Sequence, residues 1–320
     1  MKIIITGGSG FIGTNLIELL LLNNCTSFLN LDKSKPFKKE HEKYWKQINI
    51  LEKDNLETIF NSFSPTHVIH LAARTDTASD ILEDYKDNTI GTDNLIEIIN
   101  KCSTVTNSVF TSTQYVYRPG EVLPLNDLDF NPHTVYGQSK VLNEVSVRKN
   151  LKTSKWTIIR PTNIWGPWNF RYKNQFFKIL KLGLFVYPDN AKDVVKSYGY
   201  VGSVVWQIYQ IITRTDIETH EKVFYVGDLP MSELLWCNEL SKAISGRKVR
   251  IVPWIILRLI AYVGDLFNII NIPFPFISSR YKSMLGNHLT PMESTYKAMG
   301  APPLSFSNQV KETVKWLKRY

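Results

Sequence analysis

The sequence predicts an α/β protein with a doubly wound parallel sheet and a smaller C-terminal lobe. Short apolar runs alternate with longer amphipathic stretches through the first half of the chain, as strands and helices do in a parallel sheet. In addition, the first apolar run, residues 3–5, leads directly into a glycine-rich turn. A chain of 320 residues that is 43% hydrophobic and 21% charged is large and apolar enough to bury such a sheet.

The glycine-rich turn is followed by a helix. Residues 6–13 are Thr-Gly-Gly-Ser-Gly-Phe-Ile-Gly, and an amphipathic stretch continues to Leu22. In a dinucleotide-binding turn, one glycine makes the tight turn, another admits a pyrophosphate, and a third lets helix and strand pack closely. We therefore expect a Rossmann-type unit. The expected cofactor-binding residues of this turn are Gly7, Gly10, Phe11, Ile12 and Gly13.

A second strand, residues 28–31, ends in Asp32, about 20 residues beyond the turn. An acid at this position can bind the hydroxyls of the adenosine ribose. Its carboxylate would repel the additional phosphate of NADP, so we expect NAD as the cofactor. NADP is the alternative, because Lys33 and Lys35 follow Asp32 and can offset the repulsion.

The alternation of strands and helices continues along the chain. The expected elements are a third strand ending at residues 49–50, a helix over 56–63, a strand over 67–71, a helix over 81–101, a strand over 108–112, a helix over 134–150, a strand over 156–159, a strand over 223–227 and a terminal helix over 311–320. In such sheets, ligands bind beyond the carboxyl ends of the strands.

A catalytic group is predicted from Tyr136 and Lys140, which lie one helical turn apart on the same helix face. A free tyrosine has a pKa near 10 and is a weak base at neutral pH. A nearby ammonium group and a positively charged nicotinamide ring would lower that pKa. The tyrosine could then exchange the proton of an alcohol while hydride moves to or from the cofactor. Thr113, at the end of the preceding strand, can hydrogen-bond the same oxygen.

These motifs resemble the extended short-chain dehydrogenase/reductase family, especially its nucleotide-sugar branch. The resemblance covers residues 1 to about 170. Besides the turn at residues 6–13, it rests on His70-Leu-Ala-Ala73, Asn88-Thr-Ile-Gly-Thr92, Tyr136-Gly-Gln-Ser-Lys140 and Arg160-Pro-Thr-Asn-Ile-Trp-Gly-Pro167. It implies that residues 1–166 form the NAD(P)-binding Rossmann domain with the active site. Residues 167–320 would be mainly a substrate-binding lobe, with some segments returning to the Rossmann sheet.

The resemblance also implies further site residues. The cofactor-binding residues would include the turn, Asp32, Tyr136 and Lys140. The resemblance adds to them Asn49, Ile50, Leu71, Ala72, Ala73 and Asn88. Those for the substrate are Arg74, Gln114, Tyr115, Asn163 and Lys196. Lys196 stands where the family often has an arginine on the nucleotide diphosphate, and Arg171 or Lys173 are candidates to share that task. Lysine supplies the charge but not the bidentate geometry of arginine. Family members often dimerise, which implies a homodimer.

Departures from the family pattern narrow the chemistry. The sugar 4,6-dehydratases carry an Asp-Glu pair after the catalytic threonine, where this chain has Gln114 and Tyr115. Sugar-acid decarboxylases have a glutamate, and GDP-fucose synthases a cysteine, at the position of Tyr115. The run from Ser112 to Tyr117 is more similar to that of dTDP-4-keto-rhamnose reductases. The resemblance therefore implies hydride transfer at C4 of a nucleotide sugar, by a 4-epimerase or by a 4-ketoreductase.

The apolar segment 251–277 contains Pro253, Trp254, Pro273, Phe274 and Pro275. Charged residues interrupt it, so a membrane-spanning helix is not expected. It is interpreted as a buried lobe or subunit contact, with a lid over the substrate or a membrane-surface helix as alternatives. The segment also motivates a second hypothesis, a dehydrogenase of sterol-like or other hydrophobic alcohols. An inactive NAD-binding scaffold or sensor is a third hypothesis.

Composition and spacing disfavour several other classes of protein. The net charge is +9, but the basic residues are spread along the chain, and no nucleic-acid partner is expected. The three cysteines are widely spaced, which favours a reducing compartment and a cytoplasmic protein. The six histidines show neither metal-ligand spacing nor a hydrolase arrangement, so no metal site is predicted.

Overall fold

The computed structural model describes residues 1–270, 272, 274 and 276–320, so Pro273 and Pro275 lie outside the described residues. Its centre is a seven-stranded sheet with strand order β11-β6-β5-β4-β1-β2-β3. All neighbouring strands in it are parallel. The strands are β1 (Ile3–Thr6), β2 (Phe28–Asp32), β3 (Trp45–Gln47), β4 (His67–His70), β5 (Asn107–Thr111), β6 (Lys155–Pro161) and β11 (Lys222–Val226).

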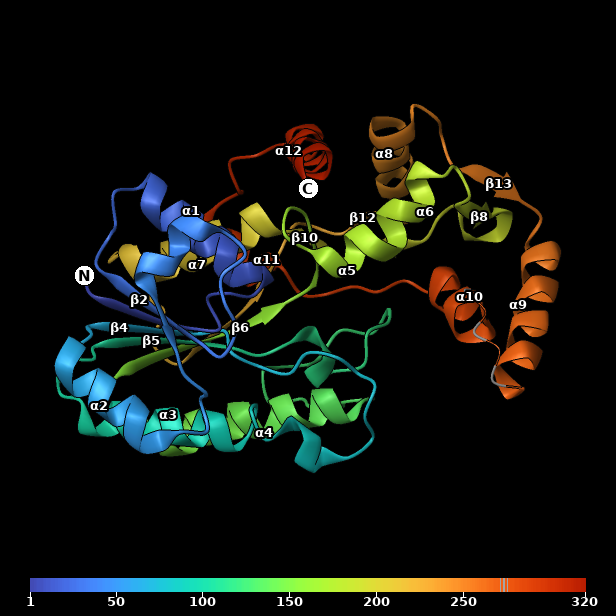
Figure 1. The fold of residues 1–320 in the computed structure, drawn as a ribbon. Helices are drawn as coiled ribbons and strands as arrows, with labels where there is room; N and C mark the ends of the chain where they lie inside the picture. Colours follow the sequence, from blue (N-terminus) through green and yellow to red (C-terminus); the bar gives the residue numbers. More distant parts are fainter. Residues whose placement is uncertain (271, 273, 275) are drawn as a thin grey trace.

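Helices cover both faces of the sheet (Figure 1). On one face lie α1 (Phe11–Leu22) and α7 (Val201–Thr213), and on the other lie α2 (Lys53–Phe63), α3 (Ile90–Lys101) and α4 (Val135–Asn150). Successive side chains of β1 point to opposite faces, so Ile3 and Ile5 join one hydrophobic core and Ile4 joins the other. The doubly wound parallel sheet predicted from the sequence is confirmed.

One predicted helix is divided in the structure. Instead of a single helix over residues 81–101, a short 3-10 helix, Leu82–Tyr85, precedes α3. Asn88 lies between them, and its side chain bonds both backbone groups of Arg74, at 2.8 and 3.0 Å, and the Ser139 hydroxyl at 2.9 Å. The prediction of one helix was wrong because this side chain fixes the backbone before the helix begins. The third strand also ends earlier than predicted, at Gln47.

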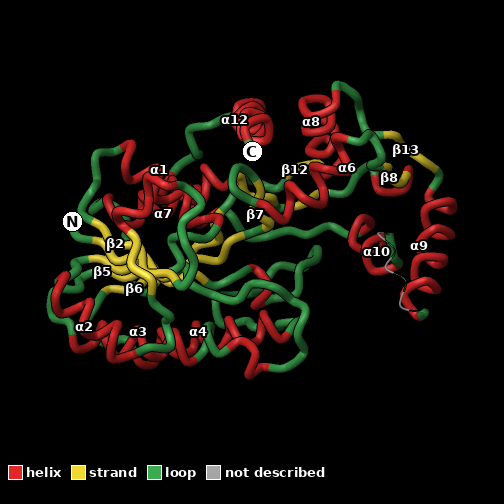
Figure 2. The backbone as a smooth tube through the Cα atoms, in the orientation of Figure 1, coloured by secondary structure: helices red, strands yellow, loops and turns green. Residues whose placement is uncertain are grey.

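The second half of the chain forms a lobe beyond the carboxyl ends of the strands (Figure 2). Its elements are β7 (Asn163–Trp165), α5 (Phe170–Tyr172), a π-helical turn (Lys173–Phe177), α6 (Lys178–Lys181), β8 (Val186–Pro188), β9 (Val195–Lys196), β10 (Tyr198–Tyr200), β12 (Met231–Ser232), α8 (Glu233–Ser245), β13 (Arg250–Val252), α9 (Trp254–Ile269) and α10 (Ser278–Leu285). Between and after them, α7, β11 and α11 (Glu293–Met299) lie nearer the sheet, and α12 (Phe306–Arg319) packs against α8.

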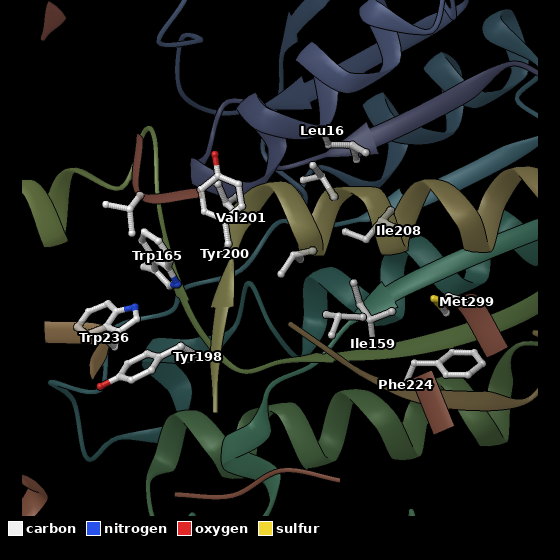
Figure 3. Packing of buried hydrophobic residues seen from close by; sticks show 14 of the residues in the cluster. Leu16, Ile159, Trp165, Tyr198, Tyr200, Val201, Ile208, Phe224, Trp236 and Met299 are labelled. Carbon is white, nitrogen blue, oxygen red and sulfur yellow. The ribbon is translucent and has the colours of Figure 1, made fainter. Parts of the chain in front are cut away.

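The lobe and the sheet share one hydrophobic core. Figure 3 shows this core extending from Leu16 and Ile159 at the sheet to Trp236 in the lobe. The Trp236 ring stacks on Tyr198, with centroids 4.2 Å apart, and meets Trp165 edge-on at 5.8 Å. Because these aromatic rings are continuous with the sheet core, the lobe is held firmly above the carboxyl ends of the strands.

Candidate active site

A cavity of about 990 Å³ lies between the sheet and the lobe, and the glycine turn forms one of its walls. Gly7 has a φ of +74°, and a Cβ there would lie 2.5 Å from the Ala72 nitrogen. A Cβ on Gly13 would lie 2.4 Å from the Gly8 Cα. Gly10 lines the cavity, and no described side chain caps the helix that begins after it. The first amides of α1 are therefore available to an anion such as a pyrophosphate.

Asp32 lies at the end of β2, on the same cavity wall. Its carboxylate accepts hydrogen bonds from the Ser9 amide at 3.0 Å and the Ser34 amide at 2.9 Å. Burial raises the pKa of Asp32, and these two amides oppose that shift. The two lysines that follow are both paired with acids, Lys33 with Asp87 at 2.7 Å and Lys35 with Glu42 at 3.7 Å.

The predicted catalytic residues Thr113, Tyr136 and Lys140 all line this cavity and are buried. Thr134 begins α4 by accepting a hydrogen bond from the Gly137 amide at 3.0 Å, which places Tyr136 in the first helical turn. The Lys140 ammonium donates to the Thr111 carbonyl at 2.8 Å. The structure thus brings together a phenol, an ammonium group and a hydroxyl at the carboxyl end of β5.

Burial shifts the pKa values of Tyr136 and Lys140 in opposite directions. Burial raises the pKa of Tyr136 to about 12, although a hydrogen bond with Thr113 opposes this. Burial also lowers the pKa of Lys140 to about 8, with the charge of Glu144 acting in the opposite direction. Burial of the phenolate thus opposes the lowering expected from the ammonium group and from a bound, positively charged nicotinamide ring.

A buried ion pair that the sequence analysis missed lies behind these residues. The Arg160 guanidinium donates to both carboxylate oxygens of Glu144 at 2.8 Å, and Ser112 donates to the same carboxylate at 2.6 Å. Glu144 lies on α4, one turn beyond Lys140, and Arg160 lies on β6. The sequence offered no signal for this pair, because its members are 16 residues apart on different elements.

The structure places the predicted substrate residues in two groups. Tyr115 and Asn163 line the cavity, and Gln114 lies behind them with its amide on the Asn163 side chain at 2.9 Å. Arg74 and Lys196 are not among the described residues of the cavity wall. Arg74 is held by Asp76 at 2.8 Å.

Lys196 is buried and lies 2.7 Å from Glu233 and 2.6 Å from the Ser283 carbonyl. Its charge is therefore neutralised inside the lobe. Arg171, a candidate to share the task of Lys196, does line the cavity, while Lys173 is absent from its described wall. A positive group is thus available to a substrate phosphate from the segment that follows β7.

The cofactor residues expected from the resemblance divide similarly. Five of them line the cavity, and these are Asn49, Ile50, Leu71, Ala72 and Ala73. Asn88 is fully buried away from the described wall and instead fixes the backbone of Arg74, directly after Ala73. Asn88 is therefore placed to position this wall and not to touch a ligand.

The lobe side of the cavity is aromatic, which the sequence analysis did not predict. Its wall includes Tyr172, Phe176, Phe185, Tyr198 and Trp236. Phe176 stacks on Trp236 at 5.0 Å and meets Phe185 edge-on at 5.2 Å. The cluster of aromatic residues over 170–177 was the available signal. Such a wall suits the flat faces of a base or a sugar.

A family model described as the NAD-dependent epimerase/dehydratase family matches residues 3–227. The match covers every strand of the central sheet and the three predicted catalytic residues. The chain belongs to this family. The resemblance to the nucleotide-sugar branch of the extended short-chain dehydrogenases/reductases is thereby confirmed, and with it the prediction of an enzyme.

Among curated relatives, a dTDP-glucose 4,6-dehydratase from Neisseria meningitidis is 27% identical over 67% of this chain and 68% of its own length. A dTDP-D-glucose 4,6-dehydratase from Dictyostelium discoideum is 31% identical over 67% of this chain and 55% of its own length. An N-acetyl-α-D-glucosaminyl-diphospho-ditrans,octacis-undecaprenol 4-epimerase from Escherichia coli O157:H7 is 26% identical, over 69% of this chain and 70% of its own length. The relatives thus include both dehydratases and epimerases.

Solved structures resemble the whole chain. The UDP-glucose 4-epimerase of Thermotoga maritima, with UDP-glucose, superposes with a TM-score of 0.73 at 23% identity, covering 100% of this chain and 99% of that one. The UDP-glucose 4-epimerase of Thermus thermophilus, in complex with NAD, gives 0.70 at 21% identity and 99% coverage of both chains. These likenesses confirm the fold of both halves.

Proposed function

We propose that the protein is an NAD-dependent nucleotide-sugar 4-epimerase, which moves hydride at C4 of the sugar with Tyr136 as the acid and base. The observation that carries this proposal is that one cavity joins the glycine turn and Asp32 to Thr113, Tyr136 and Lys140. A dinucleotide held along the turn would therefore present its reactive end to the catalytic residues.

The residues of the cavity fit NAD. The glycine turn and the uncapped amides of α1 suit the pyrophosphate, and Asp32 suits the adenosine ribose. NAD is favoured over NADP because Lys33 and Lys35 are engaged by Asp87 and Glu42 and so offset little of the repulsion from Asp32. When bound, NAD supplies the hydride acceptor and donor.

The chain's own residues would handle the proton. Thr113 and Tyr136 would bind the C4 oxygen, and the Tyr136 phenolate would take its proton on oxidation and return it on reduction. The Lys140 ammonium, fixed on the Thr111 carbonyl, would stabilise that phenolate. For epimerisation, the keto sugar must turn so that hydride returns to its opposite face, and a cavity of about 990 Å³ provides room for this.

The position after Thr113 favours simple hydride transfer over dehydration. Gln114 is an amide bonded to Asn163, and burial raises the pKa of Tyr115, so that its phenol stays protonated at neutral pH. Neither side chain is a carboxylate that could act as acid or base for the loss of water. For this reason we propose an epimerase although several relatives at about the same identity are dehydratases.

A 4-ketoreductase or 4-dehydrogenase is the second candidate. A GDP-6-deoxy-D-talose 4-dehydrogenase from Aggregatibacter actinomycetemcomitans is 30% identical over 52% of this chain and 54% of its own length. Both candidates use the same proton relay. They differ in whether the cofactor is restored within each turnover.

The deciding experiment is to dialyse the purified protein, denature it and analyse the small molecules released. Retained NAD, together with C4 inversion of a UDP-, dTDP- or GDP-sugar followed by NMR, is the expected result. Release of no dinucleotide, with reversible NADH or NADPH consumption by a 4-keto sugar, would support the reductase. Turnover of a sterol or another hydrophobic alcohol, and of no nucleotide sugar, would contradict both.

A further inference from the structure

The helix α9 exposes an apolar surface at the outer end of the lobe, far from the sheet (Figure 1). Only Leu257, Ala261 and Gly264 of this helix are buried. Large apolar side chains that are each 39–76% exposed occupy Ile255, Ile256, Leu259, Ile260, Tyr262, Val263, Leu266 and Ile269. With about 3.6 residues per turn, they cover about half of the circumference, opposite the buried stripe. Within one chain, most of α9 is therefore not part of a buried lobe, and the expected subunit contact stays a prediction.

The buried stripe of α9 fastens it to the lobe. Leu257 and Ala261 pack against Tyr281 of α10, and Gly264 admits the backbone of the following segment, since a Cβ there would lie 2.1 Å from the Phe276 carbonyl. No described residue between 251 and 277 lines the cavity, which argues against a lid. Met284 of α10 does line it, so one helix separates the exposed surface from the cavity.

The charges around α9 are strongly one-sided. Between residues 246 and 286 the sequence has six basic residues and one acidic residue. The basic residues are Arg247, Lys248, Arg250, Arg258, Arg280 and Lys282. The acid, Asp265, accepts a hydrogen bond from the Ser278 amide at 3.0 Å. An exposed apolar helix within a segment of this positive charge complements an anionic lipid bilayer.

From this geometry we propose that α9 binds in the plane of an anionic membrane surface, with its apolar arc in the acyl boundary and its basic neighbours on the headgroups. Arg258 lies at the edge of the arc, where it donates to the Tyr262 hydroxyl at 3.0 Å and lies 5.8 Å from the Trp254 ring. Arginine, tryptophan and tyrosine are residues that favour the interface between lipid and water. The proposal does not depend on the reaction proposed above.

A second copy of the chain suits this surface less well. A two-fold contact through α9 would bring two positively charged segments together, and like charges would repel. Among the described residues, no helix has both the length and the hydropathy needed to cross a membrane. At 16 residues, α9 is about 24 Å long.

The test is co-sedimentation of the full-length protein with vesicles of phosphatidylcholine alone or mixed equally with phosphatidylglycerol. We expect binding to the mixed vesicles, weaker binding to phosphatidylcholine, and a loss of binding at high salt. The double variant L259Q/L266Q should bind at least about tenfold more weakly, because two exposed leucines no longer enter the lipid. R247E/K248E should weaken binding only to the mixed vesicles.

Matched controls use residues of the same kinds elsewhere. L22Q changes a leucine that is 80% exposed on α1, and K152E/K155E reverses two exposed charges near β6. Both should bind vesicles like the wild type. Failure of the wild type to bind mixed vesicles would overturn the proposal. Sedimentation velocity would then show whether L259Q/L266Q dissociates a dimer, in which case the surface is a subunit contact.

Discussion

Glu144 and Arg160 form a bidentate ion pair inside the protein, with both nitrogen–oxygen distances at 2.8 Å and both side chains at most 1% exposed. The pair joins α4, which carries Tyr136 and Lys140, to β6 of the sheet. It therefore fixes the catalytic helix relative to the strand beside it.

The first prediction concerns this pair. Glu144→Gln keeps the shape of the side chain and leaves the Arg160 charge buried without its partner, so the free energy of unfolding should fall by about 3–5 kcal/mol. Glu57→Gln is the control, because it breaks an exposed pair with Lys101 at 3.0 Å and should cost less than about 1 kcal/mol. Chemical denaturation measures both. Similar small losses for the two variants would mean that the buried pair does not stabilise the fold.

The second prediction concerns the proton relay. Tyr136→Phe should lower kcat by about a hundredfold to ten-thousandfold, because the proton acceptor is lost, while NAD affinity changes little. Tyr85→Phe is a suitable control, since this buried tyrosine has its ring centroid 6.2 Å from that of Tyr136 and bonds only backbone carbonyls among the described residues. Unchanged turnover in Tyr136→Phe, measured by sugar NMR, would exclude Tyr136 as the acid and base.

The third prediction is a pH dependence of stability. The pKa of Lys140 is lowered from 10.5 to about 8 in the folded state, so between these values the unfolded chain binds more protons and stability rises with pH. The pKa of Tyr136 is raised from 10.0 to about 12, so above about pH 10 the folded state binds more protons and stability falls.

Denaturation of the wild type and of Lys140→Met across this range isolates the lysine contribution. The difference in unfolding free energy between the two proteins should change steadily from about pH 8 to pH 10. A difference that stays flat would show that Lys140 keeps an ordinary pKa in the folded protein.

Local patterns carried most of the successful sequence predictions. Spacing alone places Tyr136 and Lys140 on one helix face, and Gly7 and Gly13 are fixed by contacts within the first strand–helix unit and its neighbour. Residue type led to a wrong prediction where the position of a side chain depends on a partner that is distant in the sequence. Lys196 was expected at the diphosphate, but Glu233, 37 residues away, holds it in the lobe.

The other differences between the predicted and the observed structure also arise from contacts that are distant in the sequence. Asn88 divides a predicted helix because Arg74 and Ser139 engage its side chain, and neither contact has a periodic signature. The pattern of α9 indicates an apolar helix, but which of its faces is covered depends on α10, which follows later in the chain. The periodicity of a sequence identifies the apolar face of a helix, but it does not identify what covers that face.

A fourth prediction tests the choice of cofactor. Asp32→Ala should weaken NAD binding by about tenfold or more, since a hydrogen bond to a charged group is lost, and should weaken NADP binding less. Asp54→Ala, at an exposed acid on α2, should leave both affinities unchanged. Fluorescence titration with both dinucleotides measures the change. A larger loss for NADP would reverse the cofactor preference.

The last prediction separates the backbone approach in the glycine turn from a general effect of replacing glycine. In Gly13→Ala the new Cβ would lie 2.4 Å from the Gly8 Cα and 2.6 Å from the Gly7 carbonyl oxygen, and these backbone atoms leave it no room. The turn must shift, which should lower the free energy of unfolding by about 1–3 kcal/mol and weaken NAD binding. In Gly120→Ala nothing lies within 4 Å of the new Cβ, so both quantities should stay near those of the wild type. If Gly13→Ala binds NAD normally, the α1 amides do not hold the pyrophosphate, and the cofactor must be bound mainly through Asp32 and the opposite wall.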